Sequence, residues 1–333
     1  VYARAIARQY GTDHTEFVVE PDALAVLDKI VWHFDEPFAD ASAIPTYYVS
    51  QMARQKVTVA LSGDGGDESL AGYIERYYLN CAEDRIRKKI PSLVRRSLLG
   101  SVARVYPKAD CLPRPLRLKN FLTNLSLSFE QAYYRDMSFY FTPEMKKRLY
   151  KPWLAAAVAK FDAFEFLGKH FRANNNSDVT SRVQYADIKT YLPEDILVKV
   201  DRMSMAHSLE IRSPLLDHTL LEFLGRLPSS VKLRGRTSKY IFKRAMEDRL
   251  PHDILYRKKQ GFSIPLASWL RGSLQKPARE SLFPANGIVN DYFETKYLDR
   301  LWKQHQAKVR DVAYPLWGLI MLQRWWETYA RQK

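Results

Sequence analysis

The spacing of apolar residues predicts two helices in the first part of the chain, with a short extended segment between them. Residues 1–10 place Ala and Ile at helical spacing and are followed by Gly11, a residue type that often ends a helix. Residues 15–19 (TEFVV) have the β-branched and aromatic composition of a strand. A second helix is predicted over 21–34, opened by Pro21, because apolar residues recur every three to four positions through Leu24, Leu27, Val31 and Phe34.

The most informative stretch runs from Val57 to Tyr73, with the sequence VTVALSGDGGDESLAGY. Its first five residues predict a short buried strand. Three glycines follow within four positions, which lets the backbone adopt positive φ, approach a ligand and cup an anion with its N–H groups. The carboxylates of Asp64, Asp67 and Glu68 would repel phosphate unless a hard cation lay between them, which implies Mg²⁺. A glycine-rich turn whose carboxylates cap the next helix explains the same residues without a ligand.

After this stretch the pattern is helical nearly throughout. Amphipathic helices are predicted over 73–89 and 92–105, and a strongly apolar helix over 313–327. Thr142, Pro143 and Glu144 are typical of a helix start, whereas an irregular connector and a polar loop are predicted around Pro107, Pro113 and Pro115, and over 174–178. Because the strands are few and come early, we expect an α/β part followed by a mostly helical part.

Composition and charge restrict the class of protein. The 52 Lys and Arg against 37 Asp and Glu give a net charge of +15, which suits nucleic acid or an anionic membrane surface. The charges are scattered, and the densest run, over 85–96, interleaves Leu and Ile in one helical region. We therefore interpret this run as a solvated face and expect no nucleic-acid partner. No apolar run reaches the ~18 residues of a membrane span. Cys81 and Cys111 lack metal-ligand spacing, so we expect reduced thiols in a cytoplasmic protein.

The residues from Leu61 to Glu68, followed by Ala71-Gly72-Tyr73, resemble the pyrophosphate-side loop of the asparagine synthetase family. These are glutamine-dependent amidotransferases of the N-type ATP pyrophosphatase class. The resemblance implies an adenine-nucleotide alpha-hydrolase-like fold with a truncated parallel sheet, and ATP and Mg²⁺ as ligands. It implies that Asp67 holds Mg²⁺ and that Asp64 orients or deprotonates ammonium. It assigns the ATP or pyrophosphate contacts to Leu61, Ser62, Gly63, Gly65 and Gly66.

Further blocks agree with the same family, in the same order. Residues 191–218 are similar to its LP-x-D-x-L…D-R-x-S-M-A…E-x-R-x-P-x-L-D pattern. That match implies Glu210 for the acid/base side and Arg212 for holding a carboxylate or the loop geometry. A buried ion pair joining two helices is the structural alternative for these charged residues. Within residues 234–250, Lys239 matches the lysine that neutralises the phosphates during adenylation.

Two more segments complete the resemblance, which covers residues 1–327. Residues 257–265 match the family's R-x-K-x-G-F-x-x-P loop, which either closes over the site or packs helices. Residues 34–53 resemble its substrate-side segment, in which Asp40 is a candidate for substrate or loop support. Turn and capping chemistry explains Asp40 equally well.

Two parts of the family pattern are absent from the sequence. There is no Ser-Gly-Gly-x-Asp-Ser loop for ATP and no N-terminal cysteine glutaminase domain. We therefore expect the chain to belong to a longer protein, and to be inactive alone. We expect residues 1–80 to form a truncated ATP-pyrophosphatase α/β part with the pyrophosphate loop. Residues 81–333 would form the mostly helical part of the same synthetase domain. The missing glutaminase domain is an expected partner, and a homodimer is left open.

The resemblance implies a reaction for the whole protein. ATP adenylates the side-chain carboxylate of aspartate, and ammonia from glutamine then yields asparagine, AMP and pyrophosphate. A related amidotransferase acting on a sugar or cell-envelope carboxylate in exopolysaccharide biosynthesis is the alternative acceptor class. A basic, non-catalytic binding module is the alternative from a different class.

Overall fold

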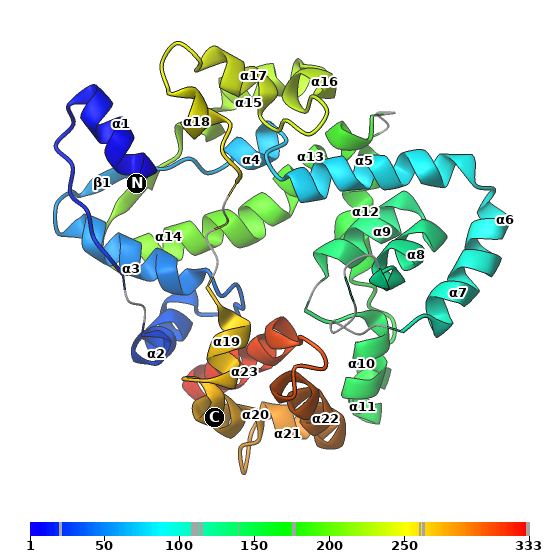
Figure 1. The fold of residues 1–333 in the computed structure, drawn as a ribbon. Helices are drawn as coiled ribbons and strands as arrows, with labels where there is room; N and C mark the ends of the chain where they lie inside the picture. The colour runs from blue at the N-terminus through cyan, green and yellow to red at the C-terminus, as the bar shows by residue number, and fades with distance from the viewer. Residues whose placement is uncertain are drawn as a thin grey trace. The chain divides into compact units, whose positions relative to one another are not determined.

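The structure, a computed structural model, describes residues 1–19, 22–107, 113, 116–138, 140–174, 178–259, 261 and 264–330. Mostly helical with one small parallel sheet, it has the expected α/β class (Figure 1). The chain divides into two compact units, each assembled from three segments. The first unit comprises Val1–Asp22, Ser42–Leu79 and Asn176–Ser263, and the second comprises Ala23–Ala41, Asn80–Asn175 and Ile264–Lys333.

The first unit holds both strands, β1 (Val59–Leu61) and β2 (Glu210–Arg212). Its longer helices are α1 (Tyr2–Tyr10), α3 (Ala43–Arg54), α13 (Val179–Lys189), α14 (Val198–Met205) and α15 (His218–Arg226). Its shorter helices are α4 (Gly66–Ser69), η3 (Leu192–Leu197), η4 (Pro214–Leu216), α16 (Ser229–Lys232), α17 (Tyr240–Ala245) and α18 (His252–Leu255). Helix α5 (Ile74–Lys89) begins here and continues into the second unit.

The two strands are parallel, and the register pairs Val59 with Glu210 and Leu61 with Arg212. The prediction of a buried strand is wrong, because Val59 is 39% exposed and Leu61 is 74% exposed. Side chains alternate between the two faces of a strand, so these residues share a face that no third strand or helix covers among the described residues. The sequence did not predict β2, since its three residues (EIR) are too short for a periodic signal.

The predicted strand over 15–19 is also wrong, because the backbone there is irregular. β-type composition is insufficient where no neighbouring strand supplies hydrogen bonds. The predicted helices agree more closely with the structure. Helix α1 ends at Gly11, whose φ of 59° is left-handed, as expected. Helix α3 begins two residues before Pro45, at Ala43. Pro21, Pro115 and Cys111 lie outside the described residues, and Cys81 is half-buried on α5.

In its described residues, the regular elements of the second unit are helices, apart from one isolated antiparallel bridge between Tyr150 and Phe293. Its longer helices are α2 (Ala23–Phe34), α8 (Lys119–Ser126), α9 (Phe129–Met137), α12 (Phe164–Ala173), α20 (Gln275–Leu282), α22 (Thr295–Gln306) and α23 (Ala313–Tyr329). Its shorter helices are α6 (Ser92–Val94), η1 (Arg95–Leu99), α7 (Gly100–Val105), α10 (Pro143–Leu149), α11 (Pro152–Ala157), α19 (Leu266–Arg271) and α21 (Ile288–Tyr292). None of the described helices is both long enough and apolar enough to cross a bilayer.

The apolar helix predicted near the end of the chain forms a core of this unit. Helix α23 packs against α2, α20 and α21, and its Leu316 and Trp317 are almost fully buried. The predicted start of α10 is confirmed, because the Thr142 hydroxyl accepts a hydrogen bond from the Met145 N–H at 3.3 Å.

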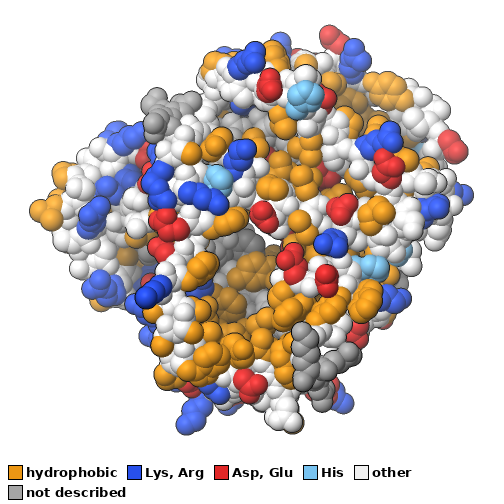
Figure 2. Space-filling view, turned by 180° about the vertical axis from the view of Figure 1, so that it is seen from behind, with side chains coloured by type: hydrophobic (Ala, Val, Ile, Leu, Met, Phe, Trp, Pro, Cys, Tyr) orange, Lys and Arg blue, Asp and Glu red, His pale blue; other side chains and the backbone are white. Residues whose placement is uncertain are grey.

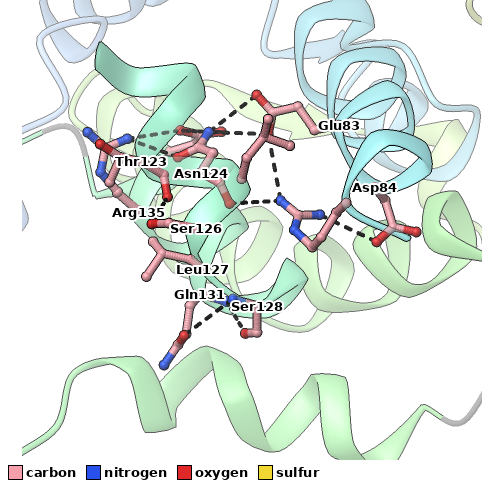
Figure 3. Close-up of polar contacts among 12 residues, drawn as sticks. Glu83, Asp84, Thr123, Asn124, Ser126, Leu127, Ser128, Gln131 and Arg135 are labelled. Carbon is pink, nitrogen blue, oxygen red and sulfur yellow. Dashed lines mark hydrogen bonds and ion pairs between the residues drawn. The ribbon is translucent and has the colours of Figure 1, made fainter. Parts of the chain in front are cut away.

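A polar cluster joins α5, α8 and α9 in the second unit (Figure 3). The Asn124 side-chain amide donates to Asp136 Oδ2 at 2.9 Å and to Glu83 Oε2 at 3.3 Å, so two carboxylates share one donor. Arg135 donates to Asn124 Oδ1 at 2.9 Å, and buried Arg87 donates to the Asn124 carbonyl at 3.1 Å. Burial, with the nearby Asp136 charge, raises the pKa of Glu83 to about 7.

The raised pKa of Glu83 makes the stability of the protein depend on pH. The folded state holds this proton more tightly than the unfolded state, whose pKa stays near the ordinary 4.5. The free energy of unfolding therefore falls as pH rises from 4.5 to about 7. Glu83→Gln, which stays neutral, is expected to match the wild-type melting temperature at pH 4.5. At pH 8 it should exceed the wild type by about 1–3 kcal/mol in unfolding free energy.

Thermal melts at the two pH values check this expectation. Glu144→Gln is the matched control, because Glu144 is exposed on α10. If Glu83→Gln changed the free energy of unfolding by the same amount at both pH values, the raised pKa of Glu83 would be contradicted.

Candidate functional site

The loop that follows β1 is anchored to the residues at the end of β2. The Ser62 N–H donates to the Arg212 carbonyl at 2.9 Å, which extends the parallel ladder by one residue. The Ser62 hydroxyl lies 2.8 Å from the Ser213 hydroxyl and donates to Asp64 Oδ2 at 2.7 Å. These bonds fix where the loop leaves the sheet and hold the Asp64 carboxylate beside it.

Two glycines of this loop leave room for neighbouring side chains, and the expected contacts with a ligand stay a prediction. Gly65 has a left-handed φ of 81°, and a Cβ there would lie 2.0 Å from Leu216 Cδ2. A Cβ on Gly66 would lie 2.6 Å from Leu215 Cδ1, so both glycines make room for η4. A Cβ on Gly63 would meet no described atom within 4 Å, so this glycine borders open space.

Asp67 lies at the centre of the site and is held by two lysines. Lys239 Nζ lies 2.9 Å from Oδ1, and Lys259 Nζ donates to Oδ2 at 2.5 Å. Burial alone would raise the pKa of Asp67, but the two ammonium groups outweigh it and hold this pKa below its usual value. The carboxylate is therefore ionised at neutral pH, and the cluster of three side chains carries a net positive charge.

Lys239 reaches Asp67 from an unusual backbone conformation. Its φ of 53° is left-handed, although it is not glycine, and it is the residue immediately before α17. Its N–H donates to the Leu70 carbonyl at 3.1 Å. Non-glycine residues in this region cost of order 1 kcal/mol and gather at functional sites.

Two contributors to the site received no role from sequence reasoning. Lys259 supplies the second cation and also lies over the Tyr73 ring, 4.2 Å from its centroid. A Cβ on Gly72 would lie 1.8 Å from Asp67 Oδ1 and 2.5 Å from Lys239 Cε, so this glycine leaves room for the ion pair. Both residues fall within sequence blocks that carry the family resemblance, which was the available signal.

Buried and half-buried hydrogen bonds from Tyr73 and from helix α13 hold the segment that carries Asp67 in place. Tyr73 donates its hydroxyl to Glu68 Oε1 at 2.8 Å, and burial raises the pKa of the Glu68 carboxyl. Gln184 on α13 donates to the carbonyls of Glu68 and Ser69 at 2.7 and 2.8 Å. Asp187 on the same helix accepts from Tyr77 at 2.8 Å. Helix α13 therefore fixes α4 and with it the position of Asp67.

Among the described residues, the ion pairs of the Asp67 cluster do not involve the other predicted residues. Glu210 and Arg212 are exposed on β2 and pair with each other at 2.7 Å, so the ion pair is a surface one. Leu61 is exposed on β1. Asp40 belongs to the second unit, where its charge adds to the burial that raises the pKa of Tyr314. The structure thus brings Asp67 and Lys239 into contact and places Asp64 on the same loop.

The described side chains alone do not complete the coordination of a divalent cation, so oxygens of phosphate or water would have to supply the remaining ligands. Among the described residues, no group of three His, Cys, Asp or Glu side chains is arranged to hold a metal. Mg²⁺ is commonly bound by one or two carboxylates together with substrate phosphates. Asp67 supplies one such carboxylate, next to two lysines that suit phosphate.

Comparison with known proteins agrees with this geometry. Residues 1–327 match the family described as asparagine synthase. The chain is 31% identical over 324 residues to "Asparagine synthetase [glutamine-hydrolyzing] 1" of Bacillus subtilis, covering 97% of this chain and 49% of that protein. It is 32% identical over 328 residues to a "Putative asparagine synthetase [glutamine-hydrolyzing]" of Mycobacterium bovis, covering 97% and 47%.

A more distant match is "Amidase chyE" of Penicillium rubens, 23% identical over 317 residues and covering 85% of this chain and 44% of that protein. The chain spans about half the length of the curated relatives that it matches. With the family match over nearly all of its residues and an adenine-nucleotide alpha-hydrolase-like α/β fold, the chain belongs to the asparagine synthase family.

Proposed function

We propose that the protein containing this chain activates the side-chain carboxylate of aspartate with ATP and transfers ammonia from glutamine to it, forming asparagine, AMP and pyrophosphate. The observation that carries the proposal is the Asp67 cluster, in which Lys239 and Lys259 converge on one ionised carboxylate in α4, the short helix after β1. Two lysines beside a glycine-containing loop suit a pyrophosphate leaving group.

The chain's own residues take separate roles in this proposal. Leu61, Ser62, Gly63, Gly65 and Gly66 form the loop beside the pyrophosphate, with Gly63 facing open space. Lys239 and Lys259 stabilise charge that develops on the phosphates, and Asp67 holds Mg²⁺, which when bound offsets phosphate charge. Asp64, held by Ser62, orients or deprotonates the ammonium. Glu210 and Arg212 remain candidates for acid/base and supporting roles, and Asp40 for substrate support.

Exchange of labelled pyrophosphate into ATP tests the proposal in the intact protein. We expect exchange that requires aspartate, and none with glutamate at the same concentration. Exchange only with uronic acids would instead assign a sugar or cell-envelope acceptor. Absence of exchange with every carboxylate would contradict both.

We also propose that the 333-residue chain alone forms no amide. Its sequence lacks the Ser-Gly-Gly-x-Asp-Ser loop that the family uses for ATP. Asparagine formed from ATP, aspartate and ammonia by this chain alone would refute that.

A further inference from the structure

The segment over residues 92–105 forms one continuous helical rod made of α6, η1 and α7, with helical backbone angles at each junction. One side of the rod packs on the second unit. Arg95 donates to the carbonyls of Leu125 and Leu127 at 3.2 and 2.8 Å, and Ala103 is 4% exposed. Lys119 on α8 donates to the Ala103 and Arg104 carbonyls, so the rod is fixed in one orientation.

The opposite side of the rod carries aliphatic residues that solvent reaches. Val94, Leu98, Val102 and Val105 recur every three to four positions and form what we call the apolar stripe, which exposed Leu93 precedes in the sequence. The exposed fractions of these residues, in sequence order from residue 93, are 77%, 41%, 59%, 39% and 83%. Inward and outward positions alternate with the helical period, so the stripe is a continuous face rather than scattered exposure.

The sequence around the stripe is basic, although Lys88 pairs with Asp84 at 2.8 Å. Between residues 85 and 107 the sequence contains Arg or Lys at 85, 87, 88, 89, 95, 96 and 104, and no Asp or Glu. Arg87 and Arg95 point inward, but Arg85, Lys88, Lys89, Arg96 and Arg104 are exposed. In Figure 2 the left-hand edge, on the side where α6 and α7 lie, shows orange and blue side chains together.

We propose that this stripe docks on an anionic phospholipid surface. An amphipathic helix with aliphatic residues on one face and Arg or Lys beside them lies in the headgroup region of a bilayer. Burial of the aliphatic side chains and attraction of the basic residues to anionic headgroups both hold it there. The sequence pattern alone suggested a solvated face for 85–96, but a solvated face does not explain five exposed aliphatic side chains.

Two other occupants fit the observations less well. A second copy of the chain would bring two rims of Arg and Lys together, and like charges repel. Nucleic acid would satisfy the basic residues but would leave the aliphatic side chains against phosphates and sugars, where they gain little. An acidic bilayer satisfies both parts of the surface.

Sedimentation of the intact protein with vesicles tests the proposal. The vesicles are phosphatidylcholine alone, or phosphatidylcholine with phosphatidylglycerol at about 7:3. We expect binding to the anionic vesicles only. Leu98→Ser with Val105→Ser, and separately Arg96→Glu with Arg104→Glu, should each weaken binding at least about tenfold. Exposed residues elsewhere in the second unit give matched controls: Val158→Ser with Phe161→Ser, just after α11, and Lys147→Glu with Arg148→Glu, in α10, should stay within about twofold.

Three results would overturn the inference. The first is no binding to anionic vesicles, or binding by both test pairs that equals that of the wild type. The second is tight binding to a duplex DNA that the Leu98 and Val105 changes leave intact. The third is a dimer, formed without lipid, that those changes dissociate. Since pyrophosphate exchange is measured without lipid, failure here leaves the proposed function untouched.

Discussion

Lys239→Ala and Lys259→Ala, made singly in the intact protein, are each expected to lower aspartate-dependent pyrophosphate exchange by about 10²–10³-fold. Each lysine ends within 3 Å of a different oxygen of Asp67, so neither replaces the other geometrically. Removing one takes away a fixed positive charge from the place where pyrophosphate charge would develop. The melting temperature should change little, because the second lysine still pairs with the carboxylate.

Neighbouring positions make this test specific. Lys258→Ala is the matched control, because Lys258 is exposed and adjacent to Lys259 in the same segment. Lys259→Arg keeps the charge but changes the shape of the donor group. Its rate of pyrophosphate exchange is expected to lie between those of the wild type and Lys259→Ala. A protein in which Lys258→Ala and Lys259→Ala are equally impaired would show that the segment matters through its overall charge, and not through Asp67.

Gly72→Ala is expected to cost about 1–3 kcal/mol of unfolding free energy and to abolish exchange. The new Cβ would meet Asp67 Oδ1, Lys239 Cε and, at 2.8 Å, the Asp67 Cα. The side-chain atoms have room to swing away, but the backbone atom has to shift, which displaces the start of α4. Because the Gly72 N–H also donates to the Asp67 carbonyl at 2.7 Å, that shift strains the turn itself.

Denaturant melts of Gly72→Ala beside Gly225→Ala check the cause. Gly225 lies in α15, and a Cβ added there would meet no described atom within 4 Å, so alanine should be neutral or stabilise by up to about 1 kcal/mol. Equal destabilisation by both changes would mean that the collision with Asp67 is not the cause.

Sequence reasoning predicted the loop, Asp67 and Lys239 as parts of one site, because each lies in a block with a recognisable local pattern. It did not predict that Lys259 and Gly72 shape the same carboxylate. Lys259 lies 192 residues from Asp67, and contacts over such separations depend on tertiary packing rather than on any local pattern. Composition also suggested a buried strand, whereas burial depends on which other elements cover the sheet.

The helices were predictable for the opposite reason. A period of three to four residues located α2, α5 and α23 closely, since amphipathic helices carry their signal within their own residues. The same period located 92–105, but it did not reveal which side of that rod faces solvent. That answer needed the Arg95 contacts with the carbonyls of α8 and the residue after it.

The left-handed backbone conformation of Lys239 lowers the stability of the protein in order to place a charged side chain beside Asp67. Glycine adopts a left-handed φ without steric penalty, whereas for lysine this conformation costs about 1–2 kcal/mol. A chain optimised only for resistance to unfolding would therefore place glycine at this position and lose the ammonium group. The positive charge beside Asp67 is thus kept at a cost in unfolding free energy. Substitutions that raise the stability of this protein need not preserve its chemistry.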